Sequence, residues 1–312
     1  MDGVHELYKA NNSRELLTLL LNSRVALKFA HNRRASEAEI TIVKEKIGAL
    51  IDNEQYEVLL RGVTKSIINE RLISKLNSND SLYDGLFLVG EKAKNFLKKS
   101  EIVPHSIKII NSVNIETATW IFESYRILSN GPIDLNFFKC QKNKQIFIDN
   151  LKDNEKLTDY YLFGLHTINS ELLVNFVSTT TSPEVAFQRQ IFDKLIVVLW
   201  RPSEYIHFFD FNKLASLKDE IIKKKLPVLE DSFYPNEKEI SFKGIILPHF
   251  IIGIHDLEAN EFILNPAILD ENPNWLKQGF DIDQTNFMQF IKQTKYQRFL
   301  MLSDKFEEKK VC

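Results

Sequence analysis

Apolar residues repeat at helical spacing in the first fifty-odd positions of the chain. Leu16, Leu17, Leu20 and Leu27 form the first series. The preceding Ser13 is of a residue type that favours the N-cap position of a helix. The pattern therefore predicts a helix that is capped by Ser13 and buries its leucine face.

A second helix is predicted after Ser36. Ser36 and Glu39 have the spacing of a capping box, in which each side chain accepts a hydrogen bond from the backbone N–H of the other residue. The apolar residues that follow repeat at helical period: Ile40, Val43, Ile47 and Leu50. Residues 1–55 are therefore expected to form an N-terminal helical lobe.

From Tyr56 onwards, short runs of strand-forming residues become frequent. The clearest cover residues 57–62, 172–177 and 194–200, and further strands are expected at 239–242 and 245–254. The run at 194–200 is a strong candidate for a buried strand, and Gly244–Ile254 is expected to be a buried strand or strand pair.

Helices are expected between these strands. Pro183 suits the first position of a short helix, and Lys213–Lys225 has a basic end that suits the helix dipole. Helices in front and strands behind, without regular alternation, indicate an α+β fold. We expect a core at 56–260, with a mostly helical insertion at about 63–160, and a C-terminal extension at 261–312.

The composition is that of an ordinary globular chain. Of its 312 residues, 44% are hydrophobic and 26% are charged. Lys and Arg number 40 against 42 Asp and Glu, and the resulting net charge of −2 argues against nucleic acid as a partner. The longest apolar stretch, Gly244–Ile254, is far shorter than the roughly 20 residues of a membrane-spanning helix. We therefore expect a soluble protein with no membrane span, and its oligomeric state is left open.

Several common sites have no motif in the sequence. The two cysteines, Cys140 and Cys312, do not indicate a disulfide framework. No pair of histidines has metal-ligand spacing, and neither a Walker loop nor a Gly-x-Gly-x-x-Gly run occurs. Residues 1–6 lack the pattern of an ordinary secretory signal peptide. We expect no metal and no Rossmann-type nucleotide site.

Three short motifs occur in an order that indicates a particular chemistry. Arg61–Gly62 lies in a predicted strand, Ser178–Thr180 ends another, and Glu237–Glu239 begins a third with two glutamates around one lysine. Each motif alone is common. Together, in this order and strand context, they resemble the arginine, Ser-Thr-Ser and Glu-x-Glu signature of ADP-ribosyltransferases of the clostridial binary toxin and vertebrate arginine-specific ecto-enzyme type.

The resemblance covers about residues 56–254, although only the short motifs carry it. It implies an ADP-ribosyltransferase-like β-sandwich core with an N-terminal helical region and a helical insertion. It also implies an enzyme that takes NAD as co-substrate and transfers ADP-ribose to an arginine of a target protein. Members of this kind are often bacterial effectors or toxins, which implies delivery into a host cytosol by a route without a signal peptide.

The resemblance assigns roles to the motif residues. Glu239 would stabilise the positive charge that develops on the ribose when the nicotinamide bond breaks, as in glycoside hydrolysis. Ser178 would hold Glu239 in position, and Arg61 would bind the phosphate or ribose side of NAD. Gly62, which has no Cβ, would allow close approach of the nicotinamide.

Glu237 indicates which acceptor is used. In the family a glutamate at this position accompanies arginine as acceptor, and a carboxylate can pair with a guanidinium and help to remove its proton. Phe233 and Tyr234, in the turn before it, are candidates for contact with the acceptor, or for simple packing of the loop.

The remaining cofactor residues follow the hydroxyl motif. Thr179 and Thr180 complete it, with threonine at the last position where serine is commoner. An aromatic residue is expected to stack on the nicotinamide, and both Phe187 and Phe192 qualify. Arg189 is a candidate for a second phosphate contact, and its alternative is an ordinary surface arginine.

Two alternatives keep the same fold. The first is an NAD glycohydrolase that uses water as acceptor. The second is an interaction module whose catalytic site is degenerate, and the intact set of Arg61, Ser178, Glu237 and Glu239 counts against it.

Overall fold

The computed structural model of the chain has two compact units. It describes residues 2–29, 33–66, 140–154, 156–157, 160, 176–188, 194–202, 208–210, 217–226, 235–243, 246 and 250–269. The first unit draws on residues 1–94, 177–208 and 245–312, and the second on residues 95–176 and 209–244.

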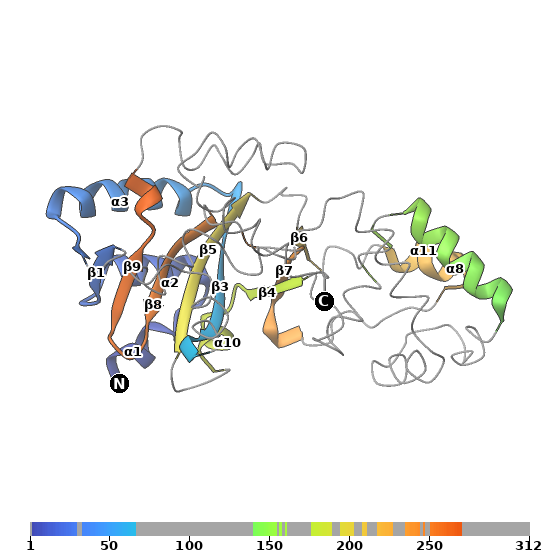
Figure 1. The fold of residues 1–312 in the computed structure, drawn as a ribbon, viewed down its shortest axis with the longest axis horizontal. Helices are drawn as coiled ribbons and strands as arrows, with labels where there is room; N and C mark the ends of the chain where they lie inside the picture. Colours follow the sequence, from blue (N-terminus) through green and yellow to red (C-terminus); the bar gives the residue numbers. More distant parts are fainter. Residues whose placement is uncertain are drawn as a thin grey trace, which may run out of the picture. The chain divides into compact units, whose positions relative to one another are not determined.

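One mixed sheet forms the framework of the first unit. Its strands are β1 (Ala26–Phe29), β2 (Arg33–Arg34), β3 (Tyr56–Thr64), β4 (Phe176–Thr180), β5 (Lys194–Pro202), β8 (Ile251–Asp256) and β9 (Glu261–Leu264). They follow the order β2-β1-β9-β8-β5-β3-β4 (Figure 1). Neighbouring strands are antiparallel except for β1 and β9, which are parallel.

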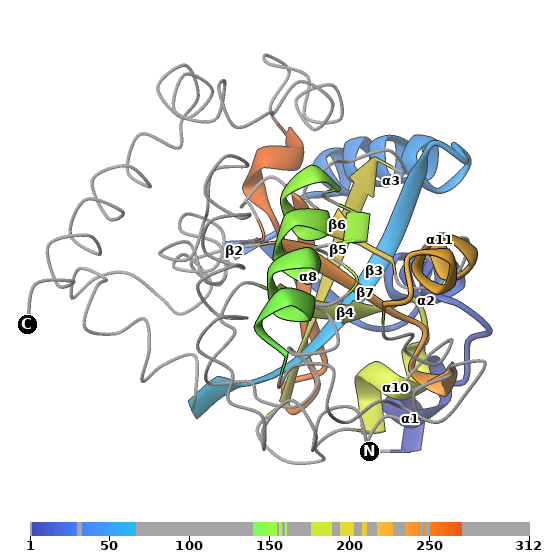
Figure 2. The same ribbon diagram turned by 90° about the vertical axis from the view of Figure 1, so that its right-hand side faces the viewer.

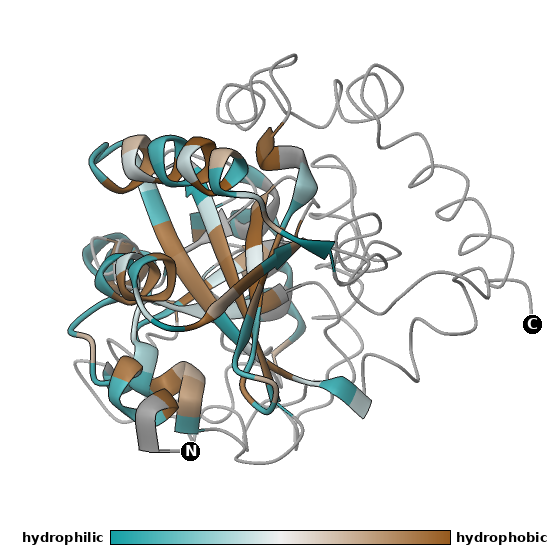
Figure 3. Ribbon diagram, turned by 90° about the vertical axis from the view of Figure 1, so that its left-hand side faces the viewer, coloured by the Kyte–Doolittle hydropathy of each residue, from teal (hydrophilic) through white to brown (hydrophobic). Residues whose placement is uncertain are grey.

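β5 is the centre of the core. Its residues from Leu195 to Trp200 are all buried. The long strands of the sheet have hydrophobic central parts (Figure 3), as expected for strands of a buried core. The Trp200 ring meets Tyr56 and Phe250 edge-on, at centroid distances of 5.4 and 5.3 Å. β3 pairs with β5 along its whole length, from Tyr56 to Thr64. The strand that carries Arg61 is therefore fixed by the most buried strand of the sheet.

The helices of the first unit flank this sheet. They are α1 (Asp2–Leu7), α2 (Ser13–Asn22), α3 (Glu37–Ile51), α10 (Pro183–Gln188) and the 3₁₀ turn η7 (Pro266–Leu269). α2, α3 and α10 all contact β3. α3 has the predicted capping box between Ser36 and Glu39, and its apolar positions Val43, Ile47 and Leu50 are buried. The guanidinium of Arg33 and the capping contacts of Ser36 lower the pKa of Glu39 to about 2.

The prediction of the first helix was wrong at both ends. Its N-cap is Asn12, whose side chain accepts a hydrogen bond from the Glu15 amide at 2.9 Å. Ser13 does not cap, because its hydroxyl donates instead to the Val58 carbonyl of β3 at 2.6 Å. The helix ends at Asn22, and Leu27 lies in β1. The N-terminal region is thus not purely helical, since it supplies β1 and β2 to the sheet.

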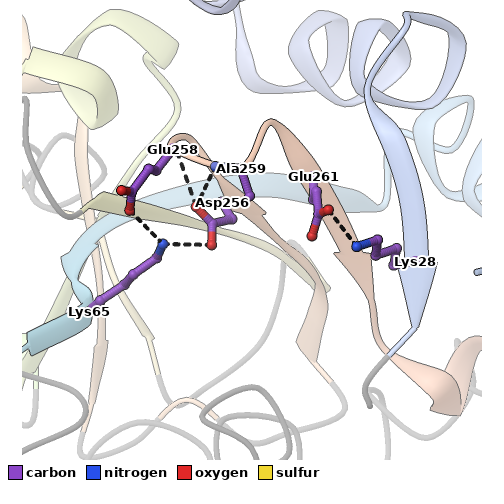
Figure 4. Close-up of polar contacts among 6 residues, drawn as sticks. All are labelled: Lys28, Lys65, Asp256, Glu258, Ala259 and Glu261. Atoms are coloured by element: carbon purple, nitrogen blue, oxygen red, sulfur yellow. Dashed lines mark hydrogen bonds and ion pairs between the residues drawn. The ribbon is translucent and has the colours of Figure 1, made fainter. Parts of the chain in front are cut away.

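Ion pairs reinforce the β8–β9 hairpin and its neighbours (Figure 4). Lys65 contacts Asp256 at 2.7 Å and Glu258 at 3.2 Å, and Lys28 of β1 contacts Glu261 of β9 at 2.5 Å. Burial favours a lower pKa for Lys65, but the hydrogen bonds and charges of Asp256 and Glu258 outweigh it, and the pKa is raised. These contacts join the end of β3 to the hairpin and β1 to β9.

The described part of the second unit contains two helices and a short strand region. Its elements are α8 (Gln141–Asp153), α11 (Lys218–Lys223), the 3₁₀ turn η5 (Pro235–Glu237) and β7 (Glu239–Lys243), with β6 (Phe208–Phe209) where the chain enters the unit. α8 lies beside α11 (Figure 2), and side-chain hydrogen bonds join Asn150 to Lys224 and Asn154 to Glu220, at 2.8 and 3.2 Å. The predicted start of α11 near Lys213 falls outside the described residues.

These elements make the chain a mixed α and β protein, which is compatible with the predicted α+β class. The strands expected around Arg61, Ser178, Lys194 and Glu239 are all present, as is the short helix at Pro183. None of the helices in the described part of the chain has the length and apolar character that a bilayer crossing requires.

Candidate functional site

The structure brings the first two motifs together on adjacent strands. Leu60 of β3 pairs with Thr180 of β4. Next to this pair, the Arg61 guanidinium donates a hydrogen bond from Nη1 to the Ser178 carbonyl oxygen at 2.6 Å. Arg61 and Ser178 are 117 residues apart in the sequence. The two motifs, which are far apart in the sequence, are therefore adjacent in the structure.

Gly62 has a packing role in this arrangement. An added Cβ would lie 2.6 Å from the Ala186 carbonyl oxygen of α10 and 2.9 Å from Cε of Lys194. The Ala186 oxygen belongs to the backbone and cannot move aside as a side chain can, so α10 can approach β3 this closely only because residue 62 is glycine. Side chains alternate between the faces of a strand, so the Arg61 side chain leaves β3 on the face opposite this contact.

The hydroxyl motif and the turn after it are tied down at several points. Thr179 and Thr180 are buried, with 4% and 6% of their surface exposed. The Thr180 hydroxyl accepts a hydrogen bond from the Ser182 amide at 2.9 Å, and the Thr181 carbonyl accepts one from the Ser13 amide at 3.1 Å. Ser178 is half-buried and is the most accessible of the three hydroxyl residues.

Phe187, one of the two candidates to stack on nicotinamide, packs inside the first unit. Its ring lies 4.9 Å from the Tyr8 ring, nearly parallel to it, and 5.3 Å from the His5 ring. Part of its aromatic surface is therefore already used by the N-terminal residues. The other candidate, Phe192, and the possible phosphate ligand Arg189 lie outside the described residues.

The stack continues to a buried histidine. Tyr8 lies parallel to His255 at 5.9 Å, and its hydroxyl is 2.8 Å from His255 Nδ1. Burial lowers the pKa of His255 to about 4, although the nearby Asn260 side chain and the charge of Asp256 act in the opposite direction. Burial also raises the pKa of Tyr8 well above its ordinary value. Both groups are therefore neutral at pH 7, and Tyr8 fastens α1 to the end of β8.

The two glutamates of the third motif lie in the second unit. Glu237 ends the turn η5 and Glu239 begins β7, and both are half-buried. Lys238 between them has a φ of 46°, in the left-handed region that residues other than glycine seldom adopt. Such backbone strain is often found at functional sites. The turn and the strained residue fix the directions in which the two carboxylates leave the chain.

Ser241 is a neighbour of Glu239 that the sequence reasoning missed. Its fully buried hydroxyl donates to Glu239 Oε1 at 2.9 Å. The sequence contained a signal for this contact, because residues two apart on a strand, such as Glu239 and Ser241, lie on the same face. Phe233 and Tyr234, the predicted acceptor contacts, lie outside the described residues. Within the part of the chain that is described, no group of His, Cys, Asp and Glu side chains could hold a metal ion.

No protein-family model, curated protein or solved structure matches this chain. The functional assignment therefore rests on the three motifs and on the geometry around them.

Proposed function

We propose that this protein transfers ADP-ribose from NAD to an arginine side chain of a target protein, with release of nicotinamide. The observation that carries the proposal is the hydrogen bond from Arg61 to the Ser178 carbonyl. It places two of the three signature motifs side by side. The expected ADP-ribosyltransferase-like sandwich, the delivery into a host cell and the choice of a host target belong to the same proposal.

Arg61 has the role of binding NAD. Its backbone is held in the fully paired strand β3, and the contact with Ser178 fixes the direction of its side chain. A guanidinium presents several N–H donors in a rigid plane, which suits the oxygens of a phosphate. The half-buried Ser178 supplies the backbone carbonyl that this cation contacts.

Glu239 has the role of stabilising the reacting ribose. The bond between nicotinamide and ribose breaks, its electron pair leaves with the nicotinamide, and a carboxylate near the ribose stabilises the developing positive charge. The Ser241 hydroxyl orients this carboxylate through Oε1. A nitrogen of the acceptor arginine then bonds to the ribose carbon, and Glu237 takes up the proton that this nitrogen loses.

The proposal is tested by incubating the protein with labelled NAD and a cell lysate. The wild type is compared with Glu239→Gln, Glu237→Gln and the matched control Glu220→Gln. Glu220 is a half-buried glutamate of the second unit that contacts Asn154 and Lys224. We expect label on a discrete protein band with the wild type and the control, released by a hydrolase specific for ADP-ribosyl-arginine.

The two signature variants separate the roles. Glu239→Gln should lose both transfer and NAD cleavage by about a hundredfold or more, whereas Glu237→Gln should lose transfer to arginine and retain slow hydrolysis. Free ADP-ribose and nicotinamide without a labelled protein would identify an NAD glycohydrolase instead. Unchanged NAD consumption in Glu239→Gln would refute the catalytic assignment.

A further inference from the structure

Lys194 is a buried cation at the start of β5. Only 3% of its surface is exposed, although the residues that follow it, Leu195–Trp200, are all apolar. Burial of an ammonium group is costly unless the group is hydrogen-bonded or paired. β5 has a second buried cation at its other end, Arg201, which forms an ion pair with Glu57 across the sheet. Lys194 makes a contact of another kind, because its ammonium group bonds to a helix.

Lys194 links three parts of the first unit. Its Nζ donates a hydrogen bond to the Phe187 carbonyl in α10, and lies 5.9 Å from the centre of the Phe187 ring. The last carbonyls of a helix have no partner within the helix and attract cations. The end of the Lys194 side chain also lies against Gly62, 2.9 Å at Cε and 3.5 Å at Nζ from where a Cβ would be.

The helix that Lys194 holds directly follows the hydroxyl motif. Only Thr181 and Ser182 separate β4 from α10, and the Thr180 hydroxyl binds the Ser182 amide within this turn. A shift of α10 away from β3 would therefore be transmitted to Ser178 and Thr180.

We infer that Lys194 is a positioning residue that locks α10 onto β3 at Gly62 and thereby sets the affinity for NAD. The inference rests on the proposed function only for the identity of the ligand. The mechanical part, that Lys194 holds α10, stands on the contacts alone.

The test uses Lys194→Met, which keeps the length of the side chain and removes its charge and its donors. Lys28→Met is the matched control, because Lys28 is also a strand lysine with a charged partner, Glu261, but lies in β1. Amide hydrogen exchange without NAD is measured at Ala186–Gln188. We expect protection there to fall by about tenfold in Lys194→Met and to stay unchanged in the control.

Steady-state kinetics give the second measurement. We expect the KM for NAD to rise by about tenfold in Lys194→Met with kcat nearly unchanged, and Lys194→Arg, which keeps the charge and the donors, to recover most of the loss. If the variant only reduced the amount of folded protein, the apparent kcat would fall and the KM for NAD would not change. That result would overturn the inference.

The two measurements keep the inference separate from the proposed function. Unchanged exchange at Ala186–Gln188 in Lys194→Met would refute the positioning role. A wild type that does not use NAD, combined with faster exchange in the variant, would refute the function and keep the mechanical part. If Lys194→Met does not fold, Gly62→Ala tests the same contact from β3, and protection of α10 must fall there too.

Discussion

At the scale of single residues, His255 links stability to pH. Its pKa is about 4 in the folded protein because of burial, against about 6.5 in an unfolded chain. Between these values the unfolded state binds more protons, so the free energy of unfolding falls as the pH falls. The contribution is fully present above pH 6.5 and is lost towards pH 4. It should amount to on the order of 3 kcal/mol, measured by urea denaturation across this range.

The control for this prediction is His255→Gln, which cannot titrate. Its stability at pH 7 should be lower, because the contact with Tyr8 is disturbed. Its decline between pH 6.5 and pH 4 should be shallower than that of the wild type. Equal slopes in the two proteins would show that other groups cause the acid sensitivity.

The environments of some single residues could not be predicted from the sequence. The run from Lys194 to Trp200 predicted a buried strand, and the structure confirms it. The sequence did not predict that Lys194 and Arg201 are themselves buried, because their burial depends on which strand and helix pack against them. Ser13 gives a similar case, since its hydroxyl bonds to Val58, 45 residues away, instead of capping its own helix.

At the scale of elements, α11 ends in a motif that usually contains glycine. The Leu226 amide bonds to the Ile221 carbonyl at 3.0 Å and the Lys225 amide to the Ile222 carbonyl at 2.9 Å, as in a Schellman cap. Lys225 has the left-handed φ of 56° that this cap requires. Lys225→Gly should therefore raise the free energy of unfolding by about 0.5–1 kcal/mol, measured by denaturant titration.

Lys223→Gly is the contrasting variant. Lys223 lies within α11 and not at its left-handed end, so glycine there should destabilise by about 1 kcal/mol. Destabilisation by Lys225→Gly as well would mean that the left-handed residue is not strained in solution.

Elements with strong local signals were predicted from the sequence. Ser36 and Glu39 form the expected capping box, and Pro183 opens the expected helix. β1 and β2 were missed because each is at most four residues long and has no alternating pattern of its own. β1 is a strand because β9 lies beside it, and that partner is far away in the sequence.

At the scale of the whole molecule, binding of NAD should stabilise the fold. A ligand that binds only the native state raises the free energy of unfolding by about 2.7 kcal/mol at a concentration of 100 Kd. The measurement is best made on Glu239→Gln, in which NAD is not consumed under the proposed mechanism. We expect its Tm to rise with NAD concentration.

Adding Arg61→Lys to that variant supplies the control. Lysine keeps the charge but loses the planar set of donors, so most of the shift in Tm should disappear. No shift with NAD in Glu239→Gln would favour an interaction module whose site is degenerate.

The parallel pairing of β1 with β9 has a consequence for how the chain is made. Leu27 lies opposite Phe262, and 262 − 27 = 235 residues separate them. At the usual pace of translation, about 5–20 residues per second, the ribosome needs roughly 12–47 s to deliver the second partner after the first. During that time a nascent β1 has no neighbour at the edge that β9 will cover. The sheet of the first unit can therefore be completed only after residue 264 has left the exit tunnel, long after β1 has been made.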